Sequence, residues 1–297
     1  MRWLLNQGYP LMILTAAAWS GNAVVGRGVT ELVPPIGLAF WRWSLALPIF
    51  IAIAWPYLRR DFPIALANWP ILVFLSVISV AMYNTFIYIG LNSTLAINAM
   101  LIHTGRPVAI VLLSYLIFRR KISAVQGIGL LIGLAGTAAI VLRGEWNLIA
   151  GISFNKGDLW IAVASFGWAI YTVFLHKRPK IHSASMMTFA VVIGLAFLAP
   201  FYLWESIYVR TVPVAPVSFW SVGFLAVIST VVAYMGYNKT VELLGANRAG
   251  LISYLVLFFG AVLAIIFLGE ELAGYHGAGG GLIIIGTYLA TKQKKED

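Results

Sequence analysis

Residues 74–79 read FLSVIS, and residues 224–229 read FLAVIS, 150 positions further along a chain of 297 residues. The correspondence continues in register: Ala99, Leu101, Ile102, Gly127, Gly129, Gly136 and Thr137 return as Ala249, Leu251, Ile252, Gly277, Gly279, Gly286 and Thr287. With a shift of one residue, Trp19 returns as Trp168 and Tyr88 as Tyr237. A period of this length is too long for a solenoid or a propeller, and it suits a half-transporter duplicated within a membrane.

Composition also indicates a membrane protein. Hydrophobic residues make up 61% of the chain and charged residues 10%, whereas a soluble domain carries about 25% charged residues. The net charge of +10 comes from Lys and Arg in short clusters between apolar runs, so the chain lacks the single basic face expected of a nucleic-acid binder. Cysteine is absent, which excludes disulfides and cysteine metal sites.

Ten apolar stretches approach the roughly 20 residues that a membrane-spanning helix needs. They cover residues 9–27, 36–55, 70–90, 95–118, 124–142, 158–176, 184–204, 217–241, 248–268 and 274–291. The first stretch resembles a signal peptide, but only Arg2 precedes it and cleavage after Ala18 would remove the start of the helix that carries Trp19. We therefore expect an all-α integral membrane protein of ten transmembrane helices that keeps its first helix.

Basic residues in the loops predict the orientation. With a cytoplasmic N-terminus and ten spans, 14 Lys and Arg residues fall on the cytoplasmic side and 4 on the far side, and Arg42 and Arg106 lie inside spans. Both termini are then cytoplasmic. Because each half has an odd number of spans, residues 1–146 and 147–297 are expected to form two inverted five-helix repeats around a central cavity, with the substrate near the midplane.

Polar and aromatic residues concentrate on three pairs of spans related by the repeat, and we take these residues as candidates for substrate binding. They are Trp19, Asn22, Tyr83, Asn84, Tyr88, Asn98, His103, Arg106, Trp168, Tyr171, Tyr234, Tyr237, Ser253 and Tyr254. Tryptophans near span ends, such as Trp55 and Trp220, fit an interfacial belt instead. For Trp19, Trp168, Tyr83 and Tyr234, packing between helices is as good an interpretation as lining of the cavity.

Arg106 is the most informative single candidate, because an arginine in the middle of a span costs about 2.5–3.5 kcal/mol on insertion. It is expected to face water, a partner or a substrate. The alternative is a structural hydrogen bond to helix carbonyls freed by Pro107. Arg42 lies about six residues from the outer end of its predicted span, so we expect it to extend its charge to the membrane surface and to be structural.

The positions of the acidic residues and glycines limit the possible mechanisms further. All ten acidic residues fall in loops, tails or near span ends, so no midplane carboxylate is available for a proton relay. Glycines crowd residues 127–136 and 277–286, which favours close helix packing, within the chain or across a dimer. No motif for a metal, a cofactor or a nucleotide is present. Monomer and homodimer both remain open.

The segment from Tyr237 to Thr287 resembles the closing signature of the drug/metabolite transporter superfamily, EamA type. It carries Leu268-Gly269-Glu270-Glu271-Leu272 ahead of Gly277-Ala278 and a glycine-rich last span. The first half resembles the same family through Pro34, Phe40-Trp41-Arg42 and Asn98-Ala99 ahead of Pro107. The two halves differ where Arg119-Arg120-Lys121 corresponds to Gly269-Glu270-Glu271, and where Leu257 stands for Pro107. The span at residues 248–268 is then expected to lack the helix break of the span at 95–118.

This resemblance implies a basket-like bundle that exports metabolites or drugs across the bacterial cytoplasmic (inner) membrane. The interior rich in Trp and Tyr is most similar to that of aromatic amino acid exporters. Alternatives are a broad drug or metabolite exporter and, from another class, a membrane-embedded enzyme, for which only His103 offers catalytic chemistry. A purely structural scaffold fits poorly with an arginine in the middle of a span. We expect a small-molecule substrate, surrounding membrane lipids, no nucleic acid, no cofactor and no metal.

Overall fold

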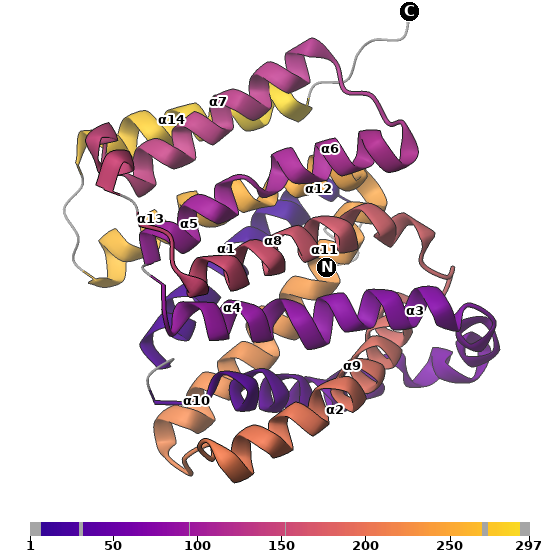
Figure 1. Cartoon of the computed structure of the whole chain (residues 1–297). Helices are drawn as coiled ribbons and strands as arrows, with labels where there is room; N and C mark the ends of the chain where they lie inside the picture. The colour runs from indigo at the N-terminus through magenta and orange to yellow at the C-terminus, as the bar shows by residue number, and fades with distance from the viewer. Residues whose placement is uncertain (1–6, 30–31, 95, 152, 269–272, 292–297) are drawn as a thin grey trace, which may run out of the picture.

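The protein is a bundle of long helices with short connections (Figure 1). The computed structural model describes residues 7–29, 32–94, 96–151, 153–268 and 273–291, and these residues form no strand. The first half contains α1 (Gly8–Val29), α2 (Pro35–Ala67), α3 (Trp69–Ser76), η2 (Val77–Met82), α4 (Tyr83–Leu91), α5 (Ala96–Thr104), α6 (Arg106–Phe118), α7 (Ala124–Val141) and η3 (Trp146–Gly151). The second half contains α8 (Lys156–Phe174), η4 (Leu175–Lys177), α9 (Ser183–Tyr208), α10 (Pro216–Phe224), η5 (Leu225–Val232), α11 (Ala233–Leu244), α12 (Ala246–Gly250), α13 (Ile252–Leu268) and α14 (Gly274–Thr291).

Local sequence explains where several helices begin. Proline occupies the first turn of α2, α3, α6 and α10, where its missing N–H costs no hydrogen bond. Capping boxes start α7 and α8: the Ser123 hydroxyl accepts from the Gln126 N–H, and the Asn155 side-chain oxygen Oδ1 accepts from the Asp158 N–H. The predicted apolar runs thus become helices that satisfy their own backbone groups, as a membrane requires.

Eight helical stretches among the described residues are long and apolar enough to cross a membrane. They are 35–67, 69–91, 98–118, 124–141, 156–177, 183–208, 216–244 and 246–263. Helices α1 and α14 are not among them, and α14 contains seven polar or neutral positions in its first turns, including Tyr275 and His276, that lower its mean hydropathy. The chain is a multi-pass membrane protein, and the count of ten spans remains a prediction.

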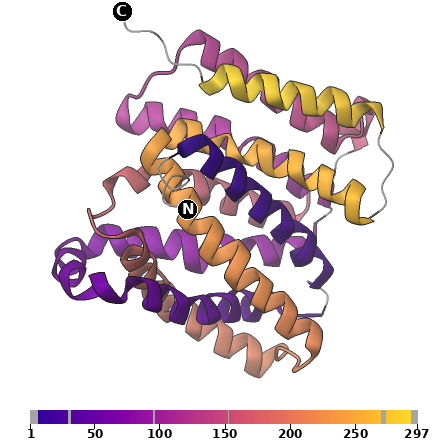
Figure 2. The ribbon, with the colours of Figure 1, turned by 180° about the vertical axis from the view of Figure 1, so that it is seen from behind.

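Two helix pairs form opposite edges of the bundle. Helices α7 and α14 lie side by side at one edge, and α2 and α9 lie at the other edge together with α10 (Figures 1 and 2). Glycine makes the first contact possible, because a Cβ on Gly129 would lie 2.4 Å from the backbone nitrogen of Ala290. The glycine-rich stretches therefore serve close helix packing within the chain, as expected.

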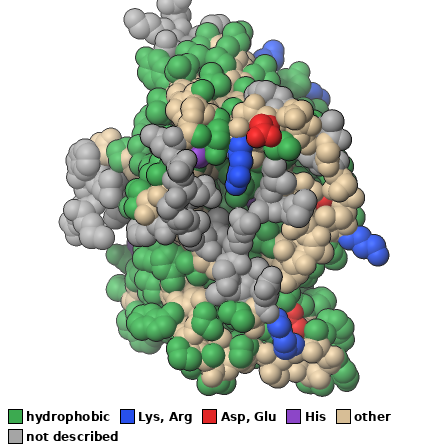
Figure 3. All heavy atoms as spheres, turned by 90° about the vertical axis from the view of Figure 1, so that its left-hand side faces the viewer, with side chains coloured by type: hydrophobic (Ala, Val, Ile, Leu, Met, Phe, Trp, Pro, Cys, Tyr) green, Lys and Arg blue, Asp and Glu red, His purple; other side chains and the backbone are tan. Residues whose placement is uncertain are grey.

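The outer surface suits a lipid environment. Large apolar side chains are exposed along the helices, for example Leu131 at 62% and Ile207 at 69%, and apolar groups also cover wide areas of the end seen in Figure 3, with scattered charged side chains. Such extensive apolar exposure marks contact with a membrane or with partners.

The helix interruptions differ from the expectation. A turn at Gly105 separates α5 from α6, directly ahead of Arg106-Pro107, as the proline predicts. A turn also occurs at Leu251, between α12 and α13, although Leu257 replaces the proline there. The expectation of an unbroken helix in the second half is therefore wrong. The turn at Leu251 comes six residues after Gly245, which has φ 79°. The position that corresponds to Gly105 in the repeat is 255, so the second turn lies four residues earlier.

Candidate substrate site

The repeated hexapeptide marks the point where two central helices widen. In each copy an α-helix passes into a π-helical segment within this hexapeptide, at Val77 in the first half and at Leu225 in the second. A π-turn shifts the backbone hydrogen bonds from the fourth to the fifth residue and is often found at functional sites. The carbonyl oxygens of Ser79 and Ser229, 150 positions apart, both accept hydrogen bonds from aromatic side chains of other helices. The Tyr234 hydroxyl donates to Ser79 at 3.2 Å, and Trp19 Nε1 donates to Ser229 at 3.1 Å.

An aromatic cluster fills the space beside these two carbonyls. We use this name for Trp19, Trp43, Tyr83, Trp168, Tyr171, Tyr234 and Tyr237. Trp168 lies at the centre, with ring centroids 5.4 Å from Trp19, 4.4 Å from Tyr83, and 5.0–5.4 Å from the three other tyrosines. Trp19 and Tyr83 are half-buried and the other five are nearly inaccessible. The structure thus brings together six of the predicted site residues, from α1, α4, α8 and α11, and adds Trp43.

The tyrosines of the second half are further fixed by polar neighbours. The Tyr171 hydroxyl donates to Asn238 Oδ1 at 2.7 Å, and Tyr237 shares a hydrogen bond of 2.6 Å with the Thr172 hydroxyl. Asn238 in turn donates to the sulfur of Met187 on α9. These bonds hold the rings of Tyr171 and Tyr237 in place, so this side of the aromatic cluster is pre-formed.

Arg42 lies at one side of the aromatic cluster and is 1% exposed. Its guanidinium donates to Thr230 Oγ1 at 2.8 and 3.0 Å, to the Tyr88 hydroxyl at 2.7 Å, to Asn84 Oδ1 at 3.0 Å and to the Ser229 carbonyl at 3.4 Å. Asn84 then donates to Tyr234 at 2.7 Å. Helices of both halves therefore meet at this one side chain.

The predicted extension of Arg42 to the membrane surface is wrong. The side chain is buried because α2 begins at Pro35, which puts Arg42 seven residues, or about 10 Å, into the helix. There the polar side chains of α4 and η5 bind its guanidinium. Three predicted site residues, Asn84, Tyr88 and Tyr234, belong to this hydrogen-bond network.

Arg106 lies beside Tyr83 of the aromatic cluster, at the start of α6. Its Cζ is 5.4 Å from the Tyr83 ring centroid, and its Nη2 is 2.7 Å from His103 Nδ1, which lies 2.8 Å from the Ser165 hydroxyl. The side chain is 7% exposed, and its Nε has no hydrogen-bond partner among the described residues. The structural alternative for Arg106 is a hydrogen bond to helix carbonyls freed by Pro107. Among the described residues, its guanidinium makes no such bond and contacts His103 instead.

Three predicted residues are not part of this arrangement. Asn98 donates to the Ser153 carbonyl and to Asp158 Oδ2, both at 3.1 Å, and so ties α5 to the start of α8. Tyr254 packs against Gly133 of α7 and donates to the Leu130 carbonyl at 3.1 Å. Ser253 is buried on α13. The side chain of Asn22 lies outside the described part of the structure.

Acidic side chains lie at helix ends, as the sequence indicated, and two of them join the halves. Glu205 on α9 accepts from the backbone N–H groups of Ile36 and Gly37 at 3.1 and 2.6 Å, at the start of α2. Asp61 on α2 accepts from the His182 N–H at 2.9 Å, at the start of α9. Each carboxylate stabilises the positive end of the partner helix. Within the described residues, no three His, Asp or Glu side chains are grouped to hold a metal ion.

Comparison with known proteins assigns the chain to a family. The sequence model of the EamA-like transporter family matches the chain twice, over residues 6–142 and 155–292. A protein of Archaeoglobus fulgidus named "Uncharacterized transporter" is 27% identical, with 96% of this chain and 98% of that protein aligned. "Uncharacterized transporter YyaM" of Bacillus subtilis is 24% identical over 86% of this chain and 84% of that protein.

More distant similarities agree with the fold. "WAT1-related protein At3g02690, chloroplastic" of Arabidopsis thaliana is 22% identical over 94% of this chain and 68% of that protein. A solved crystal structure superposes with a TM-score of 0.78, covering 94% of each chain at 20% identity. Since the family model covers most of both halves, the chain belongs to the EamA-like transporter family.

Proposed function

We propose that this transporter exports small amphipathic metabolites, most specifically aromatic amino acids, through a cavity that opens alternately to either side of the membrane. The observation that carries the proposal is the position of Arg106, whose buried guanidinium lies against Tyr83 at the border of the aromatic cluster and keeps one N–H donor without an acceptor among the described residues. A buried donor is costly to leave unpaired. A substrate carboxylate would supply the acceptor.

The substrate's two ends would be recognised differently. A guanidinium presents a planar fork of donors that matches a carboxylate, so Arg106 would bind the negative end. The half-buried rings of Trp19 and Tyr83 are the accessible members of the aromatic cluster, and they would stack on the substrate's ring, since offset or edge-to-face contacts add about 0.5–1.5 kcal/mol beyond burial. An aromatic amino acid carries both a ring and a carboxylate.

A broad exporter of drugs or metabolites is the second candidate. Its support is the predominance of rings over directional polar groups around Trp168, since a ring surface accepts many apolar shapes. The two candidates differ in the role of the carboxylate. An amino acid exporter requires it, whereas a broad exporter also carries neutral and cationic aromatic compounds.

The pairing of helices supports two inverted units, residues 1–146 and 147–297. Helix α1 packs against η5, α11 and α13, and its counterpart α8 packs against η2, α4, α5 and α6. The pairs α2–α9 and α7–α14 each join equivalent helices of the two halves. Each first helix thus packs against helices of the other half, as a two-fold axis in the membrane plane would produce. Alternating access would follow from movement of one unit against the other.

For orientation we propose the bacterial cytoplasmic membrane with both termini inside, because most basic loop residues lie on that side. Single cysteines can test this, since the chain has none of its own. Lys180→Cys should react with an impermeant reagent only from the cytoplasm, and Phe154→Cys, at the other end of α8, only from outside. Reaction of both from the same side would overturn the topology.

Uptake by proteoliposomes tests the function itself. Labelled phenylalanine, tyrosine and tryptophan should enter faster than leucine, glutamate and the corresponding aromatic amines, with and without a pH gradient. Equal transport of acids and amines would favour the broad exporter. Transport of none of these compounds by well-folded protein would contradict both candidates.

A further inference from the structure

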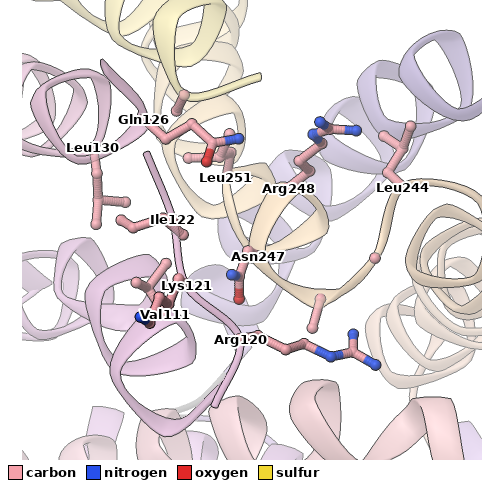
Figure 4. A pocket seen from close by; sticks show the side chains of 13 residues that line it. Val111, Arg120, Lys121, Ile122, Gln126, Leu130, Leu244, Asn247, Arg248 and Leu251 are labelled. Atoms are coloured by element: carbon pink, nitrogen blue, oxygen red, sulfur yellow. The ribbon is translucent and has the colours of Figure 1, made fainter. Parts of the chain in front are cut away.

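A second site lies at the end of the bundle that carries the α6–α7 connection. A pocket of about 370 Å³ opens between this connection, α7, the α11–α12 turn and α14 (Figure 4). Its lining includes three cationic side chains, Arg120, Lys121 and Arg248, together with the amides of Gln126 and Asn247. None of its 13 lining residues is acidic. The pocket is therefore suited to an anion.

An apolar groove continues directly from this pocket. It has a volume of about 470 Å³ and shares Val111, Arg120, Lys121, Ile122 and Leu130 with the first pocket. Its other walls are Val108, Leu112 and Tyr115, which follow one another at helical spacing along α6. Leu112 is 54% exposed and Tyr115 is 42% exposed, so the groove is open on the outer side of the helix. A cationic pocket thus adjoins an open apolar channel.

We propose that these two compartments bind one anionic phospholipid, with its phosphate near Arg120 and Arg248 and an acyl chain along α6. A free phosphate or a small organic anion would use only the first compartment. Charge complementarity favours an anionic headgroup, because basic pockets between membrane helices attract such lipids. The adjoining apolar groove favours an occupant that also carries a hydrocarbon chain. This site is independent of the transported solute, since it shares no residue with the aromatic cluster.

The backbone at this connection agrees with a role for its side chains. Arg119 adopts φ 55°, in the left-handed region that favours glycine, and the corresponding residue of the second half is Gly269. Its turn is closed by the N–H groups of Arg119 and Arg120, which donate to Tyr115 and Ser114. A basic run therefore occupies a strained turn in one half, where the other half has Gly269-Glu270-Glu271. The first half thus supplies Arg120 and Lys121 to the pocket, and the second half supplies Arg248.

Competition between lipids tests the proposal. Purified protein is incubated with equimolar phosphatidylglycerol and phosphatidylcholine of matched acyl chains, and retained lipid is counted by native mass spectrometry. We expect roughly tenfold preference for phosphatidylglycerol, and a fall of about fivefold in that preference for Arg120→Gln and for Arg248→Gln. Lys180→Gln removes the same charge at the same end but outside the pocket, so it should leave the preference unchanged.

The groove is tested without removing any charge. Leu112→Trp should fill the channel and reduce retention of phosphatidylglycerol several-fold, while leaving the effect of inorganic phosphate on Tm unchanged. Four outcomes would overturn the proposal: no preference between the lipids, an equal loss in Lys180→Gln, full retention in Leu112→Trp, or stabilisation by inorganic phosphate that matches that by the lipid. If Arg120→Gln fails to fold, Arg248→Gln and Leu112→Trp carry the same test.

Discussion

The two buried arginines, Arg42 and Arg106, are both nearly inaccessible to solvent but have different surroundings. Arg42 is surrounded by Thr230, Tyr88 and Asn84, with five hydrogen bonds reaching across the two halves. Arg106 has one hydrogen-bond contact, to His103, an adjacent ring, and an Nε without a partner among the described residues. A saturated guanidinium serves the fold, whereas an incompletely bonded one at the edge of a ring cluster is available to a ligand.

The π-turns explain part of this difference. At Ser229 the carbonyl accepts from both Trp19 and Arg42, and Thr230 directly after it accepts twice from Arg42. A regular α-helix would hold that carbonyl in its own bonding pattern. Arg106 lies instead beside the turn at Gly105, where no such widening occurs. The same repeat that duplicates the fold therefore supplies the interior acceptors for Arg42.

The largest expected effect comes from Arg42→Met. The substitution leaves Asn84, Tyr88 and Thr230 buried without their main partner, at about 1–3 kcal/mol for each orphaned group. We expect a marked loss of Tm or no folded protein, measured by fluorescence-detected size exclusion and by thermal unfolding. Normal Tm together with lost transport would instead assign Arg42 to substrate binding, and the contrast with Arg106 would fail.

A transport effect without a stability effect is expected for Tyr83→Ala. Tyr83 is half-buried and contacts both Arg106 and Trp168, so its removal takes away a cation–π contact and a stacking surface worth about 1–2 kcal/mol together. Uptake of aromatic amino acids should fall about tenfold. Tyr83→Phe keeps the ring and should retain most of the activity. Equal losses in the two variants would show that the hydroxyl matters rather than the ring.

A smaller effect is expected for Tyr234→Phe, which belongs to the Arg42 side. Its hydroxyl accepts from Asn84 and donates to the Ser79 carbonyl, and losing both bonds should cost about 1–2 kcal/mol of stability. Thermal unfolding in one detergent measures this change. Transport per folded molecule should stay near the parental value, and a tenfold drop in it at unchanged Tm would contradict the division of roles.

Much of the helical pattern follows from the sequence alone. Apolar runs, first-turn prolines and the boxes at Ser123 and Asn155 locate the helices, and repeat-matched residues such as Trp19 and Trp168 meet in the interior. Long apolar stretches and duplicated positions are strong signals because lipid and symmetry constrain them.

The rest could not be predicted for physical reasons. The π-turns lie inside mostly apolar runs and carry no distinctive residue pattern, so the acceptor role of Ser229 is invisible in the sequence. The distance of Arg42 from a span end does not reveal its polar partners, which come from α4 and η5. Asn98 was expected at the substrate site, yet Asp158 of the α8 capping box holds it, and the Asn155-x-x-Asp158 pattern was the available signal.

The most direct test of the account compares phenylalanine with phenethylamine, its decarboxylated analogue, in proteoliposomes of the parent protein and of Arg106→Met. A charge-assisted hydrogen bond contributes about 1.5–3 kcal/mol, which is roughly tenfold or more in rate. The parent should therefore transport the acid at least about tenfold faster than the amine, and Arg106→Met at unchanged Tm should lose this preference through slower transport of the acid. Parental transport of phenylalanine by well-folded Arg106→Met would contradict the assignment of Arg106 to the substrate carboxylate.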